Sequence, residues 1–146
     1  MAEVFLADDA ATEALGEALA RKTPLGGTWL LRGDLGAGKT TWTRGFLRGL
    51  GGDADEVASP TYAVMHRYEL SAGSLFHLDL YRTGTQGAWA LGLEERITAS
   101  DRLVVEWAEA LDGPWPTGWV AILQLRQEGE GRRGEWTLPD ESLIRG

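Results

Sequence analysis

Residues 33–40 have the sequence Gly-Asp-Leu-Gly-Ala-Gly-Lys-Thr, a complete match to the pattern Gly-x-x-x-x-Gly-Lys-Ser/Thr. In a chain of this length and average composition, a chance match has a probability on the order of half a per cent. The pattern has structural meaning only between a strand and the start of a helix. The β-branched and apolar run at 28–31 predicts that strand, and residues 39–50, which end before Gly51-Gly52, predict that helix. The sequence therefore predicts a phosphate-binding loop within an α/β fold.

The residue types of this loop suit a nucleotide phosphate. Glycines allow backbone amides to approach phosphate oxygens without a Cβ clash, and the helix N-terminus adds partial positive charge. Lys39 supplies a point charge for the β- and γ-phosphates, and the Thr40 hydroxyl can bind Mg²⁺. The chain has 12 arginines but only two lysines, Lys22 and Lys39. One of these two lysines thus stands where phosphate chemistry requires it.

Two carboxylates are candidates for the acid that a nucleotide hydrolase needs near its metal. Asp79 ends the apolar run 75–79, and Glu106 ends the apolar run 103–106. Open α/β sheets place their ligands at such strand ends. One acid is expected to hold Mg²⁺, directly or through water, while the other orients or deprotonates the attacking water. Spacing alone does not decide between them, and a helix cap or a surface ion pair is the structural alternative for each.

Two further features lie near these acids. Ser59-Pro-Thr-Tyr62 falls between the phosphate-loop helix and Asp79, where many nucleotide hydrolases have a loop that senses the γ-phosphate. An ordinary turn at the end of a strand is the alternative. His77 lies inside the run that ends in Asp79, and we interpret it as a hydrogen-bonded core histidine in preference to a ligand or proton shuttle.

The composition excludes several classes of protein. The 146 residues carry a formal net charge of −8, which argues against a protein that grips nucleic-acid phosphates unaided. The absence of cysteine excludes disulfides, thiol nucleophiles and zinc-thiolate sites. Residues 1–10 lack the basic residues of a signal peptide, and the apolar runs are too short to span a membrane. We expect one domain, 1–146, in a soluble cytoplasmic protein.

The order of elements predicts the architecture. Helices are expected after Asp8 or Asp9, at 39–50, at 86–97 and from 107. Strands are expected at 3–6, 28–31, 57–59, 62–68, 75–80 and 103–106, followed by a terminal hairpin of 119–126 and 133–138. This pattern predicts an α/β three-layer sandwich of the P-loop NTPase type, with a mixed, mainly parallel central sheet and a C-terminal hairpin.

Four motifs in a fixed order carry a family resemblance. They are Gly33-Asp-Leu-Gly-Ala-Gly-Lys-Thr-Thr41, Ser59-Pro-Thr-Tyr62, His77-Leu-Asp-Leu-Tyr-Arg82 and Val105-Glu-Trp107. Together they resemble the TsaE (formerly YjeE) family, small bacterial ATPases of tRNA threonylcarbamoyladenosine (t6A) biosynthesis, over about residues 12–109. The phosphate loop is shared with many proteins, so the other three motifs make the match specific. The family commonly has Pro where this chain has Ala108 and often Phe where it has Tyr62, and neither difference removes a functional group.

The resemblance implies an activity and partners. The expected reaction is Mg²⁺-dependent hydrolysis of ATP to ADP and phosphate, required for t6A modification at tRNA position 37. The implied partners are the threonylcarbamoyl-transferase subunit (TsaD-like) and its scaffold paralogue (TsaB-like). Contact with tRNA is expected only through that complex, and none with a membrane.

The resemblance also assigns roles to residues. Phosphate binding falls on consecutive loop positions: Gly36, Ala37, Gly38, Lys39, Thr40 and Thr41. Thr40 and Glu106 would hold Mg²⁺, with Asp79 as the second acid near the attacking water.

The remaining implied roles concern the two ends of the nucleotide. Thr61 would sense the γ-phosphate and act in catalysis with Lys39 and Asp79. Trp107 would pack beside the nucleotide. Thr12 and Arg132 resemble positions that contact the adenine.

Other functions agree less well with the sequence. A small P-loop kinase acting on a metabolite is the main alternative, but the chain has no arginine-rich lid segment and no spare length for an acceptor-binding domain. A GTP-binding switch would need an Asn-Lys-x-Asp motif, which does not occur. A non-catalytic nucleotide-binding subunit would not need two carboxylates at strand ends.

Overall fold

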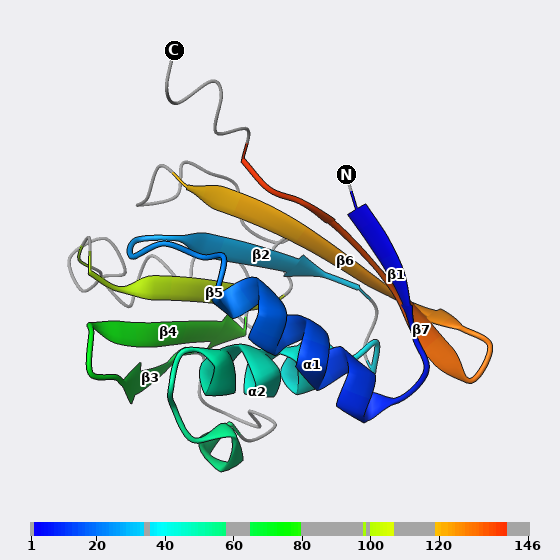
Figure 1. Cartoon of the computed structure of the whole chain (residues 1–146), viewed down its shortest axis with the longest axis horizontal. Coiled ribbons are helices and arrows are strands. Elements are labelled where there is room, and N and C mark those ends of the chain that lie inside the picture. The colour runs from blue at the N-terminus through cyan, green and yellow to red at the C-terminus, as the bar shows by residue number, and fades with distance from the viewer. Residues whose placement is uncertain are drawn as a thin grey trace.

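The computed structural model describes residues 2–33, 36–57, 65–79, 98, 100–106 and 119–139. In this part of the chain, seven strands form one sheet, and two α-helices lie side by side on one face of it (Figure 1). The elements are β1 (Ala2–Leu6), α1 (Asp9–Ala20), β2 (Thr28–Arg32), α2 (Lys39–Gly49), the 3₁₀ helix η1 (Ala54–Glu56), β3 (Met65–Glu69), β4 (Ser74–Asp79), β5 (Arg102–Glu106), β6 (Val120–Glu128) and β7 (Gly131–Thr137).

The sheet is mixed, as the sequence predicts. Its strand order is β1-β7-β6-β2-β5-β4-β3, and the four central strands β6, β2, β5 and β4 are parallel. The remaining pairings, β1–β7, β7–β6 and β4–β3, are antiparallel and lie toward the edges. Parallel strands bring their carboxyl ends to one edge, so Arg32, Asp79 and Glu106 all end their strands there.

Several predicted elements are found with adjusted bounds. Asp8 caps α1 by accepting a hydrogen bond from the Ala11 amide at 2.8 Å. The terminal hairpin is longer than predicted, because β6 and β7 continue to a turn at Gly129-Glu130 in which Gly129 has a φ of 60°. The helices expected at 86–97 and from 107 lie outside the described residues.

The strand expected at 57–59 is wrong at its first residue. Val57 follows η1, and its amide donates to the Ala54 carbonyl, so it closes a 3₁₀ turn. Its side chain is 2% exposed and belongs to the core. The apolar character that suggested a strand therefore reflects burial.

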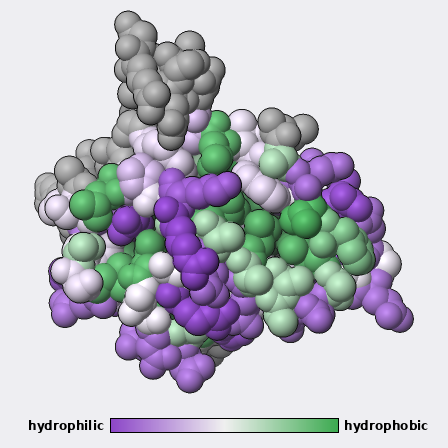
Figure 2. Space-filling model, viewed as in Figure 1, coloured by the Kyte–Doolittle hydropathy of each residue, from purple (hydrophilic) through white to green (hydrophobic). Residues whose placement is uncertain are grey.

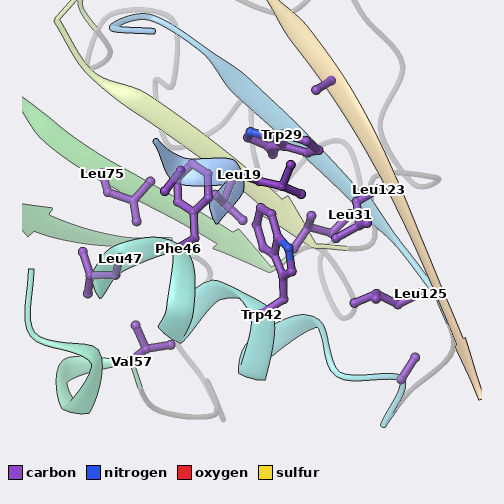
Figure 3. Close-up of a cluster of buried hydrophobic side chains, with 14 of the residues drawn as sticks. Leu19, Trp29, Leu31, Trp42, Phe46, Leu47, Val57, Leu75, Leu123 and Leu125 are labelled. Atoms are coloured by element: carbon purple, nitrogen blue, oxygen red, sulfur yellow. The ribbon is translucent and has the colours of Figure 1, made fainter. Parts of the chain in front are cut away.

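Aromatic side chains hold the phosphate-loop helix against the sheet. Trp29 of β2 lies with its ring centroid 5.4 Å from that of Trp42 of α2, and Trp42 stacks on Phe46 at 5.0 Å (Figure 3). All three side chains are fully buried. The Trp29 indole N–H donates to the Thr23 hydroxyl at 2.8 Å. This packing fixes α2, and with it the loop that precedes α2, relative to the carboxyl ends of the strands.

The two helices meet at glycines. A Cβ at Gly45 would lie closer to the Glu13 carbonyl oxygen than real Cβ atoms approach, and the same holds for Gly16 and the Trp42 carbonyl oxygen. At the solvent side, Arg48 pairs with Glu13 and Glu17 at 3.2 Å each. Figure 2 shows hydrophilic residues in a band over this face. The α1 and α2 backbones are therefore in direct contact.

The change Gly45→Ala is expected to destabilise the fold by about 1–3 kcal/mol, because the added methyl forces two backbones apart. In the interior of a solvent-exposed helix, the same change would stabilise the folded state by about 1 kcal/mol. Urea unfolding followed by tryptophan fluorescence measures the difference. The control is Gly51→Ala, where φ is +92° but the space is open, so only the backbone cost of about 1–2 kcal/mol applies. A stabilised Gly45→Ala protein would contradict the close helix contact.

Candidate nucleotide-binding site

The glycine-rich loop connects β2 to α2 and has the backbone of a phosphate cradle. Gly33, Gly36 and Gly38 have φ values of 148°, 83° and 103°, a region that side chains with a Cβ disfavour. Gly38 is the N-cap of α2 and provides no side-chain hydrogen bond to the helix amides. Among the described residues, and leaving aside its chain neighbours, no heavy atom lies within 4 Å of the place that a Cβ on Gly36 would occupy. The loop can therefore present backbone amides to an anion.

Lys39 lies across this loop. It is the first residue of α2 and is 5% exposed. Its ammonium group donates a hydrogen bond to the Gly33 carbonyl oxygen, so the charge is held beside the first glycine of the motif. The predicted phosphate ligands Gly36 and Thr41 lie on either side of Lys39 in the chain.

Thr40 and Glu106 are brought together although 66 positions separate them. The Thr40 hydroxyl lies 3.4 Å from Glu106 Oε1. Glu106 is 3% exposed at the end of β5, and Asp79 is its register partner on β4. The predicted hydroxyl and both predicted acids therefore meet at one edge of the sheet, with Glu106 adjacent to the hydroxyl.

The contact between His77 and Glu106 was not predicted from the sequence. The prediction of a hydrogen-bonded core histidine is confirmed, since His77 is 1% exposed and its Nε2 pairs with Glu106 Oε2. The available signal was the two-residue spacing of His77 and Asp79, which puts both on one face of β4. Glu106 of the neighbouring strand β5 lies on the same face of the sheet, because it is the register partner of Asp79.

A second cluster joins the start of α1 to β7 and the loop. Arg132 Nη1 donates to Asp9 Oδ1 at 2.7 Å and to the Thr12 hydroxyl at 3.1 Å. The Arg132 side chain also packs against Gly38, where a Cβ would lie 2.8 Å from Arg132 Nε. The two residues predicted near the adenine are thus in contact with each other and beside the phosphate loop.

Two predicted site residues, Thr61 and Trp107, lie outside the described residues. So do Asp34 and Leu35 of the glycine-rich motif, and Tyr81 and Arg82 of the His-Leu-Asp-Leu-Tyr-Arg segment.

The residues present fit a magnesium ion shared with a nucleotide. Within the described ranges, no group of three or more His, Cys, Asp or Glu side chains gathers as a metal cage. Mg²⁺ needs none, because it is usually held by one or two protein oxygens together with substrate phosphates and water. Thr40 and Glu106 supply such oxygens beside the loop.

His66 and Tyr68 lie on β3, the outermost strand beside β4, and continue the row of buried polar side chains outward from His77. Their rings stack with centroids 6.2 Å apart, and His66 lies 6.4 Å from His77. Burial, and to a lesser degree the nearby His77, lowers the pKa of His66. Burial raises the pKa of Tyr68, and Glu56 and Glu106 add to that rise.

The lowered pKa of His66 predicts a pH dependence of stability. Unfolded His66 has an ordinary pKa near 6.5 and binds a proton more readily than folded His66, so its contribution to the free energy of unfolding falls as the pH drops below 6.5. We expect His66→Gln to flatten the stability profile between pH 7 and pH 5. Urea unfolding at pH 5, 6, 7 and 8 measures how the free energy of unfolding changes with pH in the unmodified protein and in the variant. Identical slopes for the two proteins would contradict the prediction.

Open α/β sheets bind ligands at the carboxyl ends of their parallel strands, next to a helix N-terminus that can hold phosphate. The loop, the threonine hydroxyl and both acids of this chain lie at that edge. The protein is therefore an α/β protein of the P-loop NTPase type.

Comparison with known proteins gives the family. The model of the family described as "Threonylcarbamoyl adenosine biosynthesis protein TsaE" matches residues 6–134. The chain is 42% identical over 113 residues to the protein named tRNA threonylcarbamoyladenosine biosynthesis protein TsaE from a Synechocystis species, covering 75% of this chain and 71% of that protein. It is 36% identical over 142 residues to the protein of that name from a Nostoc species, covering 94% and 86%. The chain belongs to the TsaE family.

A solved structure agrees with this assignment. The crystal structure of Bacillus subtilis YdiB superposes with a TM-score of 0.72 at 26% sequence identity, and the match covers 99% of this chain and 89% of that one. In the described part of the chain, no helix has the length and apolar character needed to cross a lipid bilayer.

Proposed function

We propose that this protein is a Mg²⁺-dependent ATPase that converts ATP to ADP and phosphate in support of t6A formation at tRNA position 37. The observation that carries the proposal is the meeting of Thr40 and Glu106 beside the phosphate loop. Family membership supports the pathway, because the relatives are named for tRNA threonylcarbamoyladenosine biosynthesis.

The loop would bind the phosphates of ATP. Backbone amides from Gly36 to Thr41 would surround the β-phosphate, and Lys39 would turn from the Gly33 carbonyl to the β- and γ-phosphate oxygens. Because Lys39 is almost wholly buried, its charge acts in an environment where water screens it little.

Thr40 and Glu106 would hold Mg²⁺. The bound ion would neutralise charge that develops on the phosphate oxygens. Asp79, the register neighbour of Glu106, would orient the attacking water and accept its proton as the water oxygen bonds to the γ-phosphorus and the bond to ADP breaks. Thr61 would sense the γ-phosphate.

The nucleoside end of ATP would lie toward α1 and β7. Thr12 and Arg132 would contact the adenine there, and Trp107 would pack beside the nucleotide. The Arg132 head group is already held by Asp9 and Thr12, so its planar face is fixed before a base arrives.

The proposed partners are the threonylcarbamoyl-transferase subunit (TsaD-like) and its scaffold paralogue (TsaB-like), in the cytoplasm. A net charge of −8 suits a protein that serves tRNA modification through partners instead of gripping tRNA itself.

ATP turnover by the purified protein, alone and with both partner subunits, tests the proposal. We expect slow basal phosphate release that requires Mg²⁺ and changes when both partners are present. Co-purification with the partners, with and without ATP, tests the assembly. Absence of hydrolysis in every mixture would overturn the proposal.

The change Glu106→Gln is expected to raise the Mg²⁺ concentration needed for tight nucleotide binding by more than about tenfold, since loss of a hydrogen-bonding neighbour of a ligand alone costs 10–100-fold. Calorimetric titration of ADP at a series of Mg²⁺ concentrations measures this. Glu56→Gln, at an exposed acid of η1, is the matched control and should match the unmodified protein. An unchanged Mg²⁺ dependence would assign Glu106 a purely structural role.

A further inference from the structure

His77 is a buried polar side chain for which the proposed reaction has no direct use. It lies on β4 with 1% of its surface exposed, on the same strand face as the core residue Leu75. Its Nε2 pairs with Glu106 Oε2, and its Nδ1 is buried without a hydrogen-bond partner among the described residues. A leucine at this position would fill the strand face without placing a polar ring in the core.

The chemistry of the pair sets the direction of the hydrogen bond. An ionised carboxylate only accepts hydrogen bonds, so the histidine Nε2 must carry the proton and donate. Nδ1 has no hydrogen-bond partner among the described residues, so the pairing with Glu106 is the hydrogen bond that these residues give the ring. His77 therefore presents one fixed donor to Glu106.

That donor determines which way the Glu106 carboxylate faces. Oε2 is hydrogen-bonded to His77, and Oε1 lies 3.4 Å from the Thr40 hydroxyl. Glu106 is 3% exposed, so its carboxylate is largely shielded from solvent that could replace a missing donor at Oε2. Rotation of the carboxylate would break the contact with His77 and move Oε1 away from Thr40.

We propose that His77 is a positioning residue that holds Glu106 Oε1 toward the metal position beside Thr40. This inference rests on the proposed Mg²⁺-dependent nucleotide site. Neighbours that hydrogen-bond a metal-binding carboxylate fix its orientation, and their loss reduces metal affinity about 10–100-fold. His77 touches neither nucleotide nor metal in this role and acts only through Glu106.

Three substitutions separate positioning from packing. His77→Leu fills similar space without a donor. In His77→Gln, the amide nitrogen lies about as far from the backbone as Nε2 of the histidine. The shorter side chain of His77→Asn carries its amide nitrogen only about as far as Nδ1. Gln should therefore keep the bond to Glu106, and Asn should lose it while staying polar.

The readout is binding of the non-hydrolysable analogue adenylyl imidodiphosphate, measured by calorimetry in EDTA and across a Mg²⁺ series. We expect His77→Leu and His77→Asn to raise the Mg²⁺ midpoint about 10–100-fold, with affinity in EDTA changed less than about twofold. His77→Gln should return the midpoint to within about threefold of the unmodified protein. In a Glu106→Gln background, His77→Leu should add no further shift, because the two changes remove one interaction.

Two sets of results would contradict the positioning role of His77. Equal midpoints for Gln, Asn and the unmodified protein would overturn it, as would an equal loss of affinity with and without Mg²⁺. If His77→Leu fails to fold, as thermal unfolding would show, the comparison of Gln with Asn still gives the answer. An unmodified protein whose nucleotide binding ignores Mg²⁺ would overturn the proposed function itself, a result distinct from unchanged midpoints in the variants.

Discussion

The change Lys39→Ala is expected to lower ATP turnover by about 10²–10³-fold, the usual loss when one preorganised donor to a developing charge is removed. Lys39 is 5% exposed and lies at the start of α2, within the glycine-rich loop. Charge grows on the phosphate oxygens as the bond to ADP breaks, and a buried ammonium group stabilises that charge more strongly than one in water. Phosphate release at saturating Mg²⁺ and ATP measures the loss.

Lys22→Ala is the matched control, because Lys22 is the one other lysine of the chain and is exposed. It should leave turnover unchanged. Turnover by Lys39→Ala within twofold of the unmodified protein would contradict the phosphate-binding role of the loop. Thermal unfolding of both variants separates lost catalysis from lost fold.

The change Asp79→Asn is expected to reduce turnover by about 10²–10⁴-fold while nucleotide affinity stays within about threefold, the pattern of a lost general base. The amide keeps the shape of the carboxyl but accepts protons poorly. Asp79 ends β4 as the register partner of Glu106, whereas Glu106 lies against the Thr40 hydroxyl. This geometry favours the water-directed role for Asp79.

Single-turnover phosphate release and calorimetric ADP binding measure the two quantities for Asp79→Asn. Asp55→Asn, at an exposed acid of η1, serves as the control with equal loss of charge. If ADP affinity falls together with turnover, Asp79 acts in binding, and the assignment of the two acids must be exchanged.

The fold was predictable where the signals are local. β2, the glycine turn and α2 follow directly from a short apolar run, the motif and a glycine stop. The place of β1 beside β7 was not predictable, because pairing between distant strands depends on register and packing that no short segment encodes. Val57 was misassigned for a related reason, since burial and strand propensity have the same apolar signal.

The site was predictable in its parts but not in its contacts. Strand-end placement identified Asp79 and Glu106 as candidates, and the motif identified Thr40. Their adjacency depends on the order of β4 and β5 in the sheet. The bond between His77 and Glu106 joins a residue to a diagonal neighbour on the next strand, since His77 pairs in register with Val104. The two-residue spacing of His77 and Asp79 places both on one face of β4, but it does not indicate which strand lies beside that face.

The position of β1 determines when folding can finish. Ala2 pairs with Trp136, so β1 lacks its partner in the described sheet until β7 has been synthesised. At about 5–20 residues per second, β1 waits roughly 7–27 seconds for its partner during translation. Contacts of such long range also slow folding. Arg132 lies opposite Leu6 in this late pairing, so its contacts with Asp9 and Thr12 form only after β7 has been made. A ribosome-bound chain that lacks β7 therefore lacks the Arg132 contacts of the proposed nucleotide site.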